Sequence, residues 1–557
     1  MSMEIPFVGR ILKDVMVPMR DGVHLAVDVY LPENQSGPLP ILLTMSAYGK
    51  NIQRQLLPQP MPSALGDACI EAGWSQDIVD REYVHVIACT RGTGQSEGEY
   101  LSMYSKQESI DGYDLVEWLA TQEYCNGDVG MMGISYFGTI QLVVAASQPP
   151  SLKAIAPLEA TQDQYLACYH GGVVDGFYSE LFTGRHSSLG WSGFQPTNAK
   201  TMSDRFWDKD KLAERVAELK ADPSVNQYNL LYSVLDCPEK NTVLFDILVN
   251  GWDEGDYWWN PELEKIDIPV LCGVAQFPDC GPKFVREPFM IYDRVQGPKK
   301  LAFFKAGWLE RPFHEHHELV LDFMDHHLKG IENGIMDEDP INIHVGGAEI
   351  VRGEKEWPLA RTEWTDFYLS PHSRLTTAKP RFENIEPDGY TQAPLFITDK
   401  MAGVEYSTGR LPQDLEVTGP VALYLNASLN AEDSWFKAQL IERNPSTGEE
   451  QEMTHGHLRC SHRQLDEERT THYQPFHRHD RASVLPVVPG EVNEYVIELY
   501  PLSHRFSKGN EIVLRVTSGD LPGQSFSYHI MPGETISYEI YRDKGYPSRL
   551  HLPVIPA

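Results

Sequence analysis

The chain has 557 residues, of which 41% are hydrophobic and 23% charged, and its formal net charge is −32 at pH 7. This length exceeds a single hydrophobic core, so two or three domains are expected. The negative charge argues against nucleic acid or an anionic membrane as a partner. It favours an enzyme that acts on neutral or cationic small molecules, although a well-solvated acidic surface would carry the same charge.

The cellular location is addressed by three features of the sequence. No apolar run approaches the roughly 20 residues needed to cross a bilayer. The first residues lack the basic-then-apolar layout of a secretory signal. The eight cysteines are scattered without paired spacing, which is typical of reduced thiols. A cytoplasmic protein is therefore expected.

The first part of the chain alternates between strand and helix patterns. Residues 11–31 predict two strands joined at Asp21-Gly22. Continuous apolar runs, typical of strands buried on both faces, and one stretch of helical spacing at residues 110–121 follow. The runs lie at residues 41–45, 83–89, 129–134 and 152–157. This order predicts an α/β fold with a parallel sheet between helices.

The pattern changes twice further along the chain. Residues 162–263 are rich in aromatic residues and contain one clear helix at 209–221, which predicts a mainly helical cap. Strands at 270–274 and 301–304 and a helix at 318–330 resume the α/β pattern. Short alternating segments then predict an antiparallel β-sandwich. We expect a catalytic core at 1–161 and 264–335, a cap at 162–263 and a sandwich at 336–557.

One serine lies between an apolar strand and a helical pattern, in Gly133-Ile134-Ser135-Tyr136-Phe137-Gly138. This is the local chemistry of a nucleophile elbow, a sharp strand-to-helix turn that exposes a hydroxyl above a parallel sheet. The following helix start would place backbone N–H groups where an oxyanion develops. The common motif is Gly-x-Ser-x-Gly, and here the second glycine comes one residue late. A small residue in a tight turn is the alternative.

A serine nucleophile also needs a base, an acid that orients the base, and oxyanion donors. Asp279 follows the strand at 270–274, as the Ser–Asp–His order of α/β-hydrolases requires. His314, His316 and His317 lie in the loop expected after the strand at 301–304. Tyr48, at the end of a central strand, is the candidate side-chain donor to the oxyanion.

Metal and phosphate chemistry are both disfavoured. Glu318 stands where the zinc motif His-Glu-x-x-His needs its second histidine. The glycine-rich stretch at 90–98 lacks the spacing of a phosphate-binding loop. We interpret it as a structural loop in which Arg91 anchors neighbouring carboxylates. No metal or cofactor is expected.

Several motifs of this chain resemble, in order and spacing, those of the CocE/NonD hydrolases. That family includes bacterial cocaine esterases, α-amino acid ester hydrolases and X-Pro dipeptidyl-peptidases. The motifs lie at residues 18–30, 46–50, 90–98, 130–138, 152–157, 323–330 and 509–516. The resemblance implies an α/β-hydrolase core, a C-terminal jelly roll and an elbow of the form Gly-x-Ser-Tyr-x-Gly, which accounts for Gly138.

The resemblance also implies roles for individual residues. Ser135 would be the nucleophile and Asp279 the acid, with Tyr48 and the backbone N–H of Tyr136 as oxyanion donors. The family's histidine follows a Gly-Pro-Trp-like strand end within a residue or two. Here Trp308 is followed by Leu309-Glu310, so the base is assigned to His314, with His316 and His317 as fallbacks.

We therefore predict a serine hydrolase that cleaves a carboxylic ester or amide of a small molecule through an acyl-enzyme. One alternative is an X-Pro dipeptidyl-peptidase or aminoacyl amide hydrolase, which needs an acidic group for the substrate amine. The acidic candidates are Asp163, Asp175, Asp253, Glu254 and Asp256. The alternative from another class is a non-catalytic binding protein on the same scaffold. A homo-oligomer is compatible with the sequence.

Overall fold

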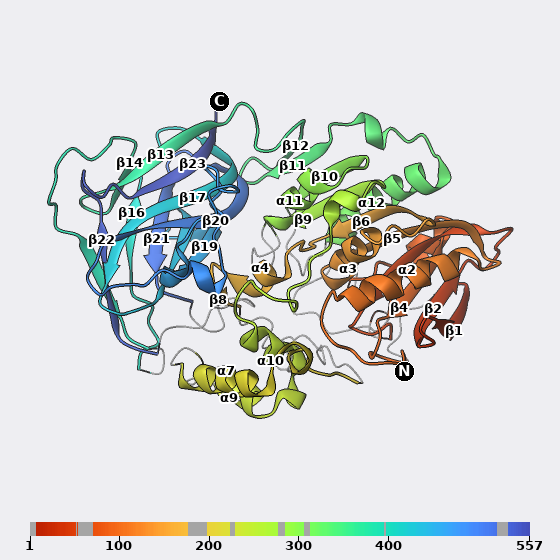
Figure 1. The fold of residues 1–557 in the computed structure, drawn as a ribbon. Helices are drawn as coiled ribbons and strands as arrows, with labels where there is room; N and C mark the ends of the chain where they lie inside the picture. Colours follow the sequence, from red (N-terminus) through yellow and green to blue (C-terminus); the bar gives the residue numbers. More distant parts are fainter. Residues whose placement is uncertain are drawn as a thin grey trace.

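The computed structural model describes residues 7–51, 53, 71–175, 198–222, 225, 229–276, 285–305, 312–394, 397–520 and 533–556. At residues 229–230 and 312–316 it describes the backbone alone. Figure 1 shows an α/β body at one end of the molecule, a β-domain at the other, and a helical segment below the junction between them.

Ten strands of the described chain form the first sheet, in the order β1-β2-β4-β3-β5-β6-β9-β10-β11-β12. Neighbours from β4 to β11 run parallel, whereas β1, β2 and β12 pair antiparallel at the two edges. The bounds are β1 Arg10–Pro18, β2 His24–Leu31, β3 Leu39–Ser46, β4 Val84–Cys89, β5 Cys125–Ile134, β6 Leu152–Leu158, β9 Val270–Ala275, β10 Lys299–Phe304, β11 Ile341–Val345 and β12 Ile350–Glu354. The predicted hairpin and parallel strands are confirmed.

Five helices of the described chain accompany this sheet: α1 Ser75–Asp80, α2 Lys106–Ala120, α3 Tyr136–Ala145, α11 Glu287–Arg294 and α12 Pro312–Lys329. α2 and α3 pack so closely that a Cβ on Gly112 would overlap the side chain of Val144. Leu328 and Met324 of α12 lie over Gly130 of β5. The central strands are therefore buried, which explains their continuous apolar sequences.

The loop at residues 90–98 is structural, as the sequence predicted. Arg91 donates two hydrogen bonds to Asp111 of α2, at 2.8 and 2.6 Å, and its Nη1 lies 2.8 Å from Asp21. Both Arg91 and Asp111 are buried. The loop thus joins the first hairpin to helix α2 through a charge-assisted pair.

A mainly helical segment follows β6, and the predicted helix at 209–221 is confirmed with the same bounds. Its elements are α4 Gln164–Cys168, β7 Tyr169–His170, β8 Val173–Val174, α6 Ser203–Phe206, α7 Lys209–Ala221, α9 Asn229–Asp236, α10 Thr242–Val249 and the 3-10 turns η3 Pro238–Lys240 and η4 Leu263–Lys265. Leu219, Phe245 and Leu248 belong to a small hydrophobic cluster of this segment. The cap therefore has a core of its own.

The C-terminal strands form a second sheet system with a separate hydrophobic core. All but one of the strand pairings among its described residues are antiparallel. Its described strands are β13 Glu363–Ser370, β14 Arg374–Thr376, β15 Asp388–Gln392, β16 Gly403–Ser407, β17 Leu415–Leu429, β18 Trp435–Arg443, β19 Glu450–Arg459, β20 Asn493–Phe506, β21 Glu511–Thr517, β22 Ile536–Tyr541 and β23 Arg549–Ile555. The all-β C-terminal domain is confirmed.

The expected boundary between core and sandwich, residue 336, precedes two strands that belong to the first sheet. β11 pairs with β10 and β12 pairs with β11, so both strands extend the first sheet and the sandwich strands begin at Glu363. Alternating sequence predicts a strand, but it does not say which sheet the strand joins. The two sheets are connected at Gly346, whose N–H donates to Ser503 O at 3.0 Å.

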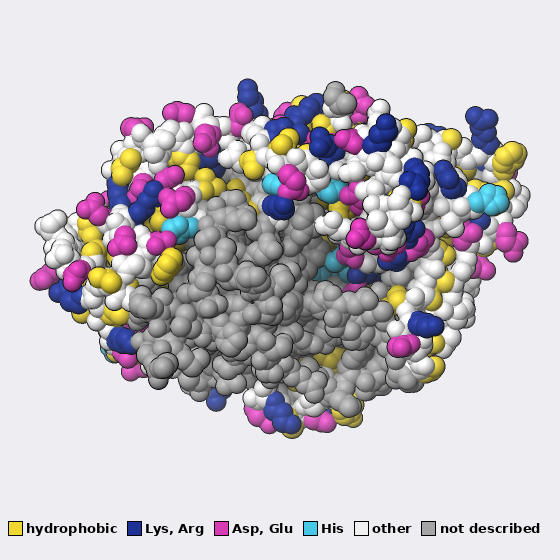
Figure 2. All heavy atoms as spheres, turned by 180° about the vertical axis from the view of Figure 1, so that it is seen from behind, with side chains coloured by type: hydrophobic (Ala, Val, Ile, Leu, Met, Phe, Trp, Pro, Cys, Tyr) yellow, Lys and Arg dark blue, Asp and Glu magenta, His cyan; other side chains and the backbone are white. Residues whose placement is uncertain are grey.

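The surface carries charges of both signs. Figure 2 shows basic and acidic side chains interspersed over the described part of one face, so the net charge of −32 is not gathered into one patch there. Within the described ranges, no helix is long and apolar enough to cross a membrane.

Candidate active site

Ser135 occupies the turn between β5 and α3 in a strained backbone conformation, with φ 60° and ψ −116°. A positive φ is uncommon for a residue with a side chain and costs about 1–3 kcal/mol, which the surrounding structure must offset. Here the Ser135 N–H donates to Leu158 O at 3.0 Å, and the Thr139 N–H donates to Ser135 O at 2.8 Å. This geometry is that of a nucleophile elbow.

The two glycines of the motif are required by contacts. Gly133 has φ 142°, and a Cβ there would lie well under 3.0 Å from the Cβ of Phe137. A Cβ on Gly138 would meet the carbonyl oxygen of Leu158 equally closely. The second glycine therefore stands one residue late because position 138, one step further into α3, is where the helix passes the end of β6.

Tyr48 lies beside the elbow. It follows β3, and its N–H donates to the Ser46 Oγ at 3.1 Å. Its ring packs against that of Tyr136, with centroids 5.4 Å apart and planes at 67°, and against Phe137 at 6.5 Å. The fold thus brings together Ser135, Tyr136 and Tyr48, although Tyr48 lies 87 positions earlier in the numbering.

The candidate base and acid are less completely described. Asp279 lies outside the described residues. His314, His316 and His317 lie in the first turns of α12 and not in a loop as predicted, because the helix begins at Pro312, a favourable first residue. The side chains of His314 and His316 lie outside the description. His317 is buried, and its Nε2 lies 3.1 Å from Asp77 Oδ2 of α1.

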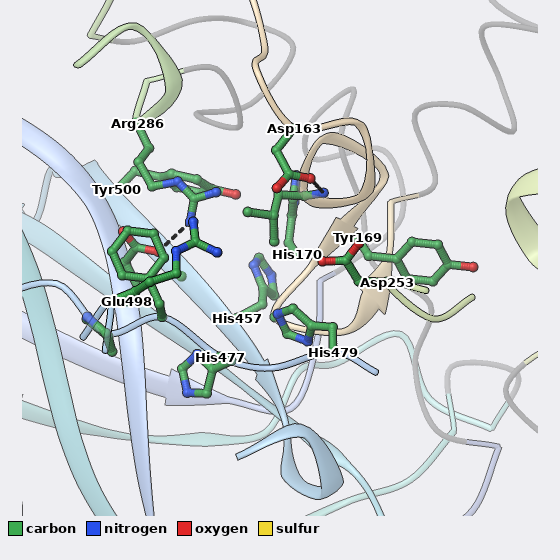
Figure 3. Close-up of a pocket in the computed structure, with 16 residues that line it drawn as sticks. Asp163, Tyr169, His170, Asp253, Arg286, His457, His477, His479, Glu498 and Tyr500 are labelled. Atoms are coloured by element: carbon green, nitrogen blue, oxygen red, sulfur yellow. Dashed lines mark hydrogen bonds and ion pairs between the residues drawn. The ribbon is translucent and has the colours of Figure 1, made fainter. Parts of the chain in front are cut away.

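A small polar cavity lies where the cap meets the sandwich. Figure 3 shows Asp163, His170 and Asp253 of the cap region facing His457 and His479 of the sandwich across it. Further wall residues are Tyr169, Arg286, Arg469, Phe476, His477, Glu498 and Tyr500. Only the two aspartates are candidates from the sequence alone, because the other walls come from segments far apart in the chain.

The backbone connects this cavity to the elbow. Ile134 of β5 is the partner of Leu158 of β6, so Ser135 and the chain after Leu158 leave the same edge of the sheet. The Thr161 N–H then donates to Thr139 Oγ1 of α3 at 3.1 Å. Asp163 is two residues further, at most about 7 Å from Thr161 between Cα atoms. The cavity therefore begins close to the elbow helix.

The cavity has an excess of carboxylates. Arg286 donates to Glu287 and Glu498, each at 2.7 Å, so its charge is compensated within the wall. Burial raises the pKa of Asp163, and burial and the neighbouring Asp163 raise the pKa of Asp253 to about 6. A neighbouring cation would favour the charged form of both carboxyl groups.

Two histidines of the cavity wall, His477 and His479, are neutral near pH 7. Burial lowers the pKa of His477 to about 4 and that of His479 well below the ordinary value. Arg469, whose guanidinium lies 4.4 Å from the ring centroid of Phe476, is a second cation of the wall. In the described part of the chain, no group of three or more histidine, cysteine or acidic side chains is arranged to hold a metal ion.

A strained serine between a central parallel strand and a helix, flanked by glycines that the packing requires, defines an α/β-hydrolase of the serine class. Residues 21–229 match the X-Pro dipeptidyl-peptidase (S15 family), and residues 333–551 match the X-Pro dipeptidyl-peptidase C-terminal non-catalytic domain. The two family models together span most of the chain, which is a serine hydrolase of this family.

Individual relatives agree over nearly the full length. A cocaine esterase from Rhodococcus sp. (strain MB1 Bresler) is 26% identical over 98% of both chains. A CocE/NonD family hydrolase from Staphylococcus aureus has a TM-score of 0.77 and 23% identity, covering 98% of this chain and 93% of that one. An α-amino acid ester hydrolase structure has a TM-score of 0.71 and 18% identity, covering 99% and 98%. The structural likenesses confirm the fold.

Proposed function

We propose that this serine hydrolase cleaves a carboxylic ester of a small molecule, with Ser135 as the nucleophile. The observation that carries the proposal is the elbow itself, with Ser135 at φ 60° at the start of α3. The Ser135 Oγ attacks the ester carbonyl carbon and a histidine takes its proton. The carbon–alkoxide bond then breaks, the histidine returns the proton to the leaving alcohol, and water hydrolyses the acyl-enzyme by the same route.

The developing oxyanion is bound by the Tyr136 N–H and the Tyr48 hydroxyl. Support comes from the position of Tyr136 as the first residue of α3 and from the packing of the Tyr48 ring against it. A helix N-terminus also carries a partial positive charge that favours an anion. The mechanism needs no metal or cofactor.

His314 is proposed as the base and Asp279 as the acid that orients it. The position of His317 against Asp77 favours His314 over that fallback. His314 is also the histidine nearest in sequence to the end of β10, where an α/β-hydrolase carries its base.

All six described cysteines are free thiols, which supports a cytoplasmic location.

A fluorophosphonate probe tests the proposal, because it labels an activated serine. We expect labelling of the wild type and turnover of p-nitrophenyl esters, and neither in Ser135→Ala. Circular dichroism of both proteins controls for folding. Turnover by a folded Ser135→Ala protein would overturn the assignment, and a folded wild type without labelling or turnover would favour a binding protein.

The cavity supports a second candidate, an ester or amide whose acyl part carries a free amine. Four carboxylates, those of Asp163, Asp253, Glu287 and Glu498, face or flank the cavity with two guanidinium groups, so a bound cation would reduce the excess of negative charge. An ammonium group would pair with Asp163 and Asp253 and lower their pKa values. The name of the amino acid ester hydrolase relative is consistent with this class.

Matched substrates test this candidate. We expect KM for an aminoacyl ester to rise at least about tenfold in Asp253→Asn, and KM for the deaminated ester to stay unchanged, because the lost interaction is with the amine. Asp256→Asn, an exposed acid outside the cavity wall, is the control. Equal KM values for the two esters in the wild type would exclude amine recognition and leave simple ester hydrolysis.

A further inference from the structure

Glu108 is a buried acid that the sequence analysis did not single out. It lies in the first turn of α2 and is 2% exposed. Its Oε2 accepts a hydrogen bond from the Ser105 N–H at 2.8 Å, while the Ser105 Oγ accepts one from the Glu108 N–H at 3.3 Å. This reciprocal capping box satisfies the helix end but uses only one of the two carboxyl oxygens.

The other carboxyl oxygen reaches the residue after the nucleophile. The Tyr136 hydroxyl donates to Glu108 Oε1 at 2.6 Å and lies 3.3 Å from the Tyr100 hydroxyl. Tyr136 is completely buried. A tyrosine hydroxyl in such a place needs a partner, because leaving it without one costs its desolvation energy. Glu108 supplies that partner from a helix that is itself anchored to the sheet.

Tyr136 lies between Glu108 and the second proposed oxyanion donor. Its ring contacts the Tyr104 ring, with centroids 4.5 Å apart, on one side and the Tyr48 ring at 5.4 Å on another. The hydroxyl end of Tyr136 is therefore held by Glu108, its ring supports Tyr48, and its backbone N–H faces the turn that carries Ser135. A shift of this one side chain would move both donors.

We propose that Glu108 is a positioning residue of the oxyanion hole, acting through the hydroxyl of Tyr136. This inference rests on the proposed function of Ser135, Tyr136 and Tyr48. Oxyanion donors stabilise the transition state only when they are held in place before the reaction. The bond from Glu108 fixes Tyr136 at the end furthest from its backbone, so the ring cannot rotate away from Tyr48.

Burial raises the pKa of Glu108 to about 8, so the group is largely uncharged at neutral pH. Glutamine is then a close mimic of the uncharged acid. Its amide oxygen can accept the Ser105 N–H, and its amide nitrogen keeps the bond to Tyr136 by donating to the hydroxyl oxygen. Glu108→Gln should retain the wild-type kcat within about threefold. Glu108→Ala and Tyr136→Phe each remove the bond and should lower kcat by about 10- to 100-fold with KM nearly unchanged.

The test is steady-state hydrolysis of a p-nitrophenyl ester by these variants in the full-length protein. Ser105→Ala is the matched control, since it removes the other half of the capping box and leaves the Tyr136 bond in place. It should lower the melting temperature without lowering kcat. The double variant Glu108→Ala/Tyr136→Phe should be no slower than the slower single variant, because both changes break one bond.

Failure of this inference is distinguishable from failure of the proposed function. If Ser135→Ala is inactive while Tyr136→Phe and Glu108→Ala keep the wild-type kcat, the positioning role is wrong and the nucleophile stands. If the two losses of kcat multiplied in the double variant, the two changes would act independently, and the positioning role would again be wrong. Should Glu108→Ala not fold, Tyr136→Phe, which removes only the hydroxyl, decides the question alone. Turnover by Ser135→Ala would remove the proposed function itself.

Discussion

Gly138 of α3 faces the carbonyl oxygen of Leu158 at a separation that leaves no room for a side chain, since a Cβ would lie well under 3.0 Å from that oxygen. The carbonyl cannot retreat, because it also accepts the Ser135 N–H at 3.0 Å. This contact fixes how closely the elbow helix approaches β6. It accounts for the chain's departure from the common elbow motif.

Gly138→Ala should therefore displace the elbow. We expect a loss of stability of about 1–3 kcal/mol from overpacking and a fall in kcat of at least about 100-fold, because the nucleophile moves with the helix. Chemical denaturation and ester turnover measure the two effects. Gly37→Ala is the control, since a Cβ at Gly37 would meet nothing within 4 Å. Normal turnover by Gly138→Ala would contradict the steric argument.

The backbone strain at Ser135 predicts a difference between two inactive variants. Ser135→Gly relieves the cost of φ 60°, whereas Ser135→Ala keeps it. We expect Ser135→Gly to be about 1 kcal/mol more stable than Ser135→Ala by urea unfolding. Both should lack turnover. A glycine variant that is less stable than the alanine variant would show that the turn is not strained.

Arg286 joins the α/β body to the sandwich through buried charges. It donates to Glu287 of α11 and to Glu498 of β20, and Glu287 also accepts the Gln162 N–H at 3.2 Å. Arg286→Met should cost about 3–5 kcal/mol, because it leaves two carboxylates without their cation. Lys544→Met breaks an exposed pair with Glu383 and should cost less than about 1 kcal/mol. Differential scanning calorimetry compares them, and equal losses would contradict the prediction.

Buried histidines predict a loss of stability in mild acid. Burial lowers the pKa of His85, in β4, to about 3. Below about pH 6.5 the unfolded chain binds a proton at this histidine that the folded protein cannot bind, so stability falls with pH from about 6.5 toward 3. Between pH 7 and pH 5 this one group should remove about 2 kcal/mol.

The contribution of His85 is measured by urea unfolding at the two pH values. Stability of His85→Gln should fall by about 2 kcal/mol less than that of the wild type between pH 7 and pH 5. His372→Asn, at an exposed position that asparagine tolerates at φ 63°, serves as the control and should fall as the wild type does. If the stability of His85→Gln fell between pH 7 and pH 5 as much as that of the wild type, another group would govern stability in acid.

Substitutions of the histidines in the first turns of α12 should differ in their effects on turnover and stability. His314→Ala should abolish ester turnover by at least about 1,000-fold with little loss of stability, as expected for a base. His317→Ala removes a buried contact with Asp77 and should lower stability while most of the turnover remains. Turnover lost with His316→Ala or His317→Ala alone would transfer the role of base to that residue.

The elbow could be predicted from sequence because its determinants are contiguous: a buried strand, the serine, two glycines and a helix. The same holds for α7, whose pattern lies within one helix and whose N-cap, Asp208, directly precedes it. Strand β19 carries no such signal, since its polar sequence with two histidines, His455 and His457, has no clear alternation of apolar residues. A local sequence pattern predicts only local structure.

By itself, the sequence determined which hydroxyl is placed in a strained turn and which segments become strands, because both depend on neighbouring residues. Tertiary structure alone decided that β12 extends the first sheet, that Glu108 meets Tyr136 across 28 positions, and that Asp163 and Glu498 face one cavity. These relationships arise from packing between segments distant along the chain. The spacing of residues along the chain does not predict these contacts, because they depend on which faces of the helices and strands are buried against one another.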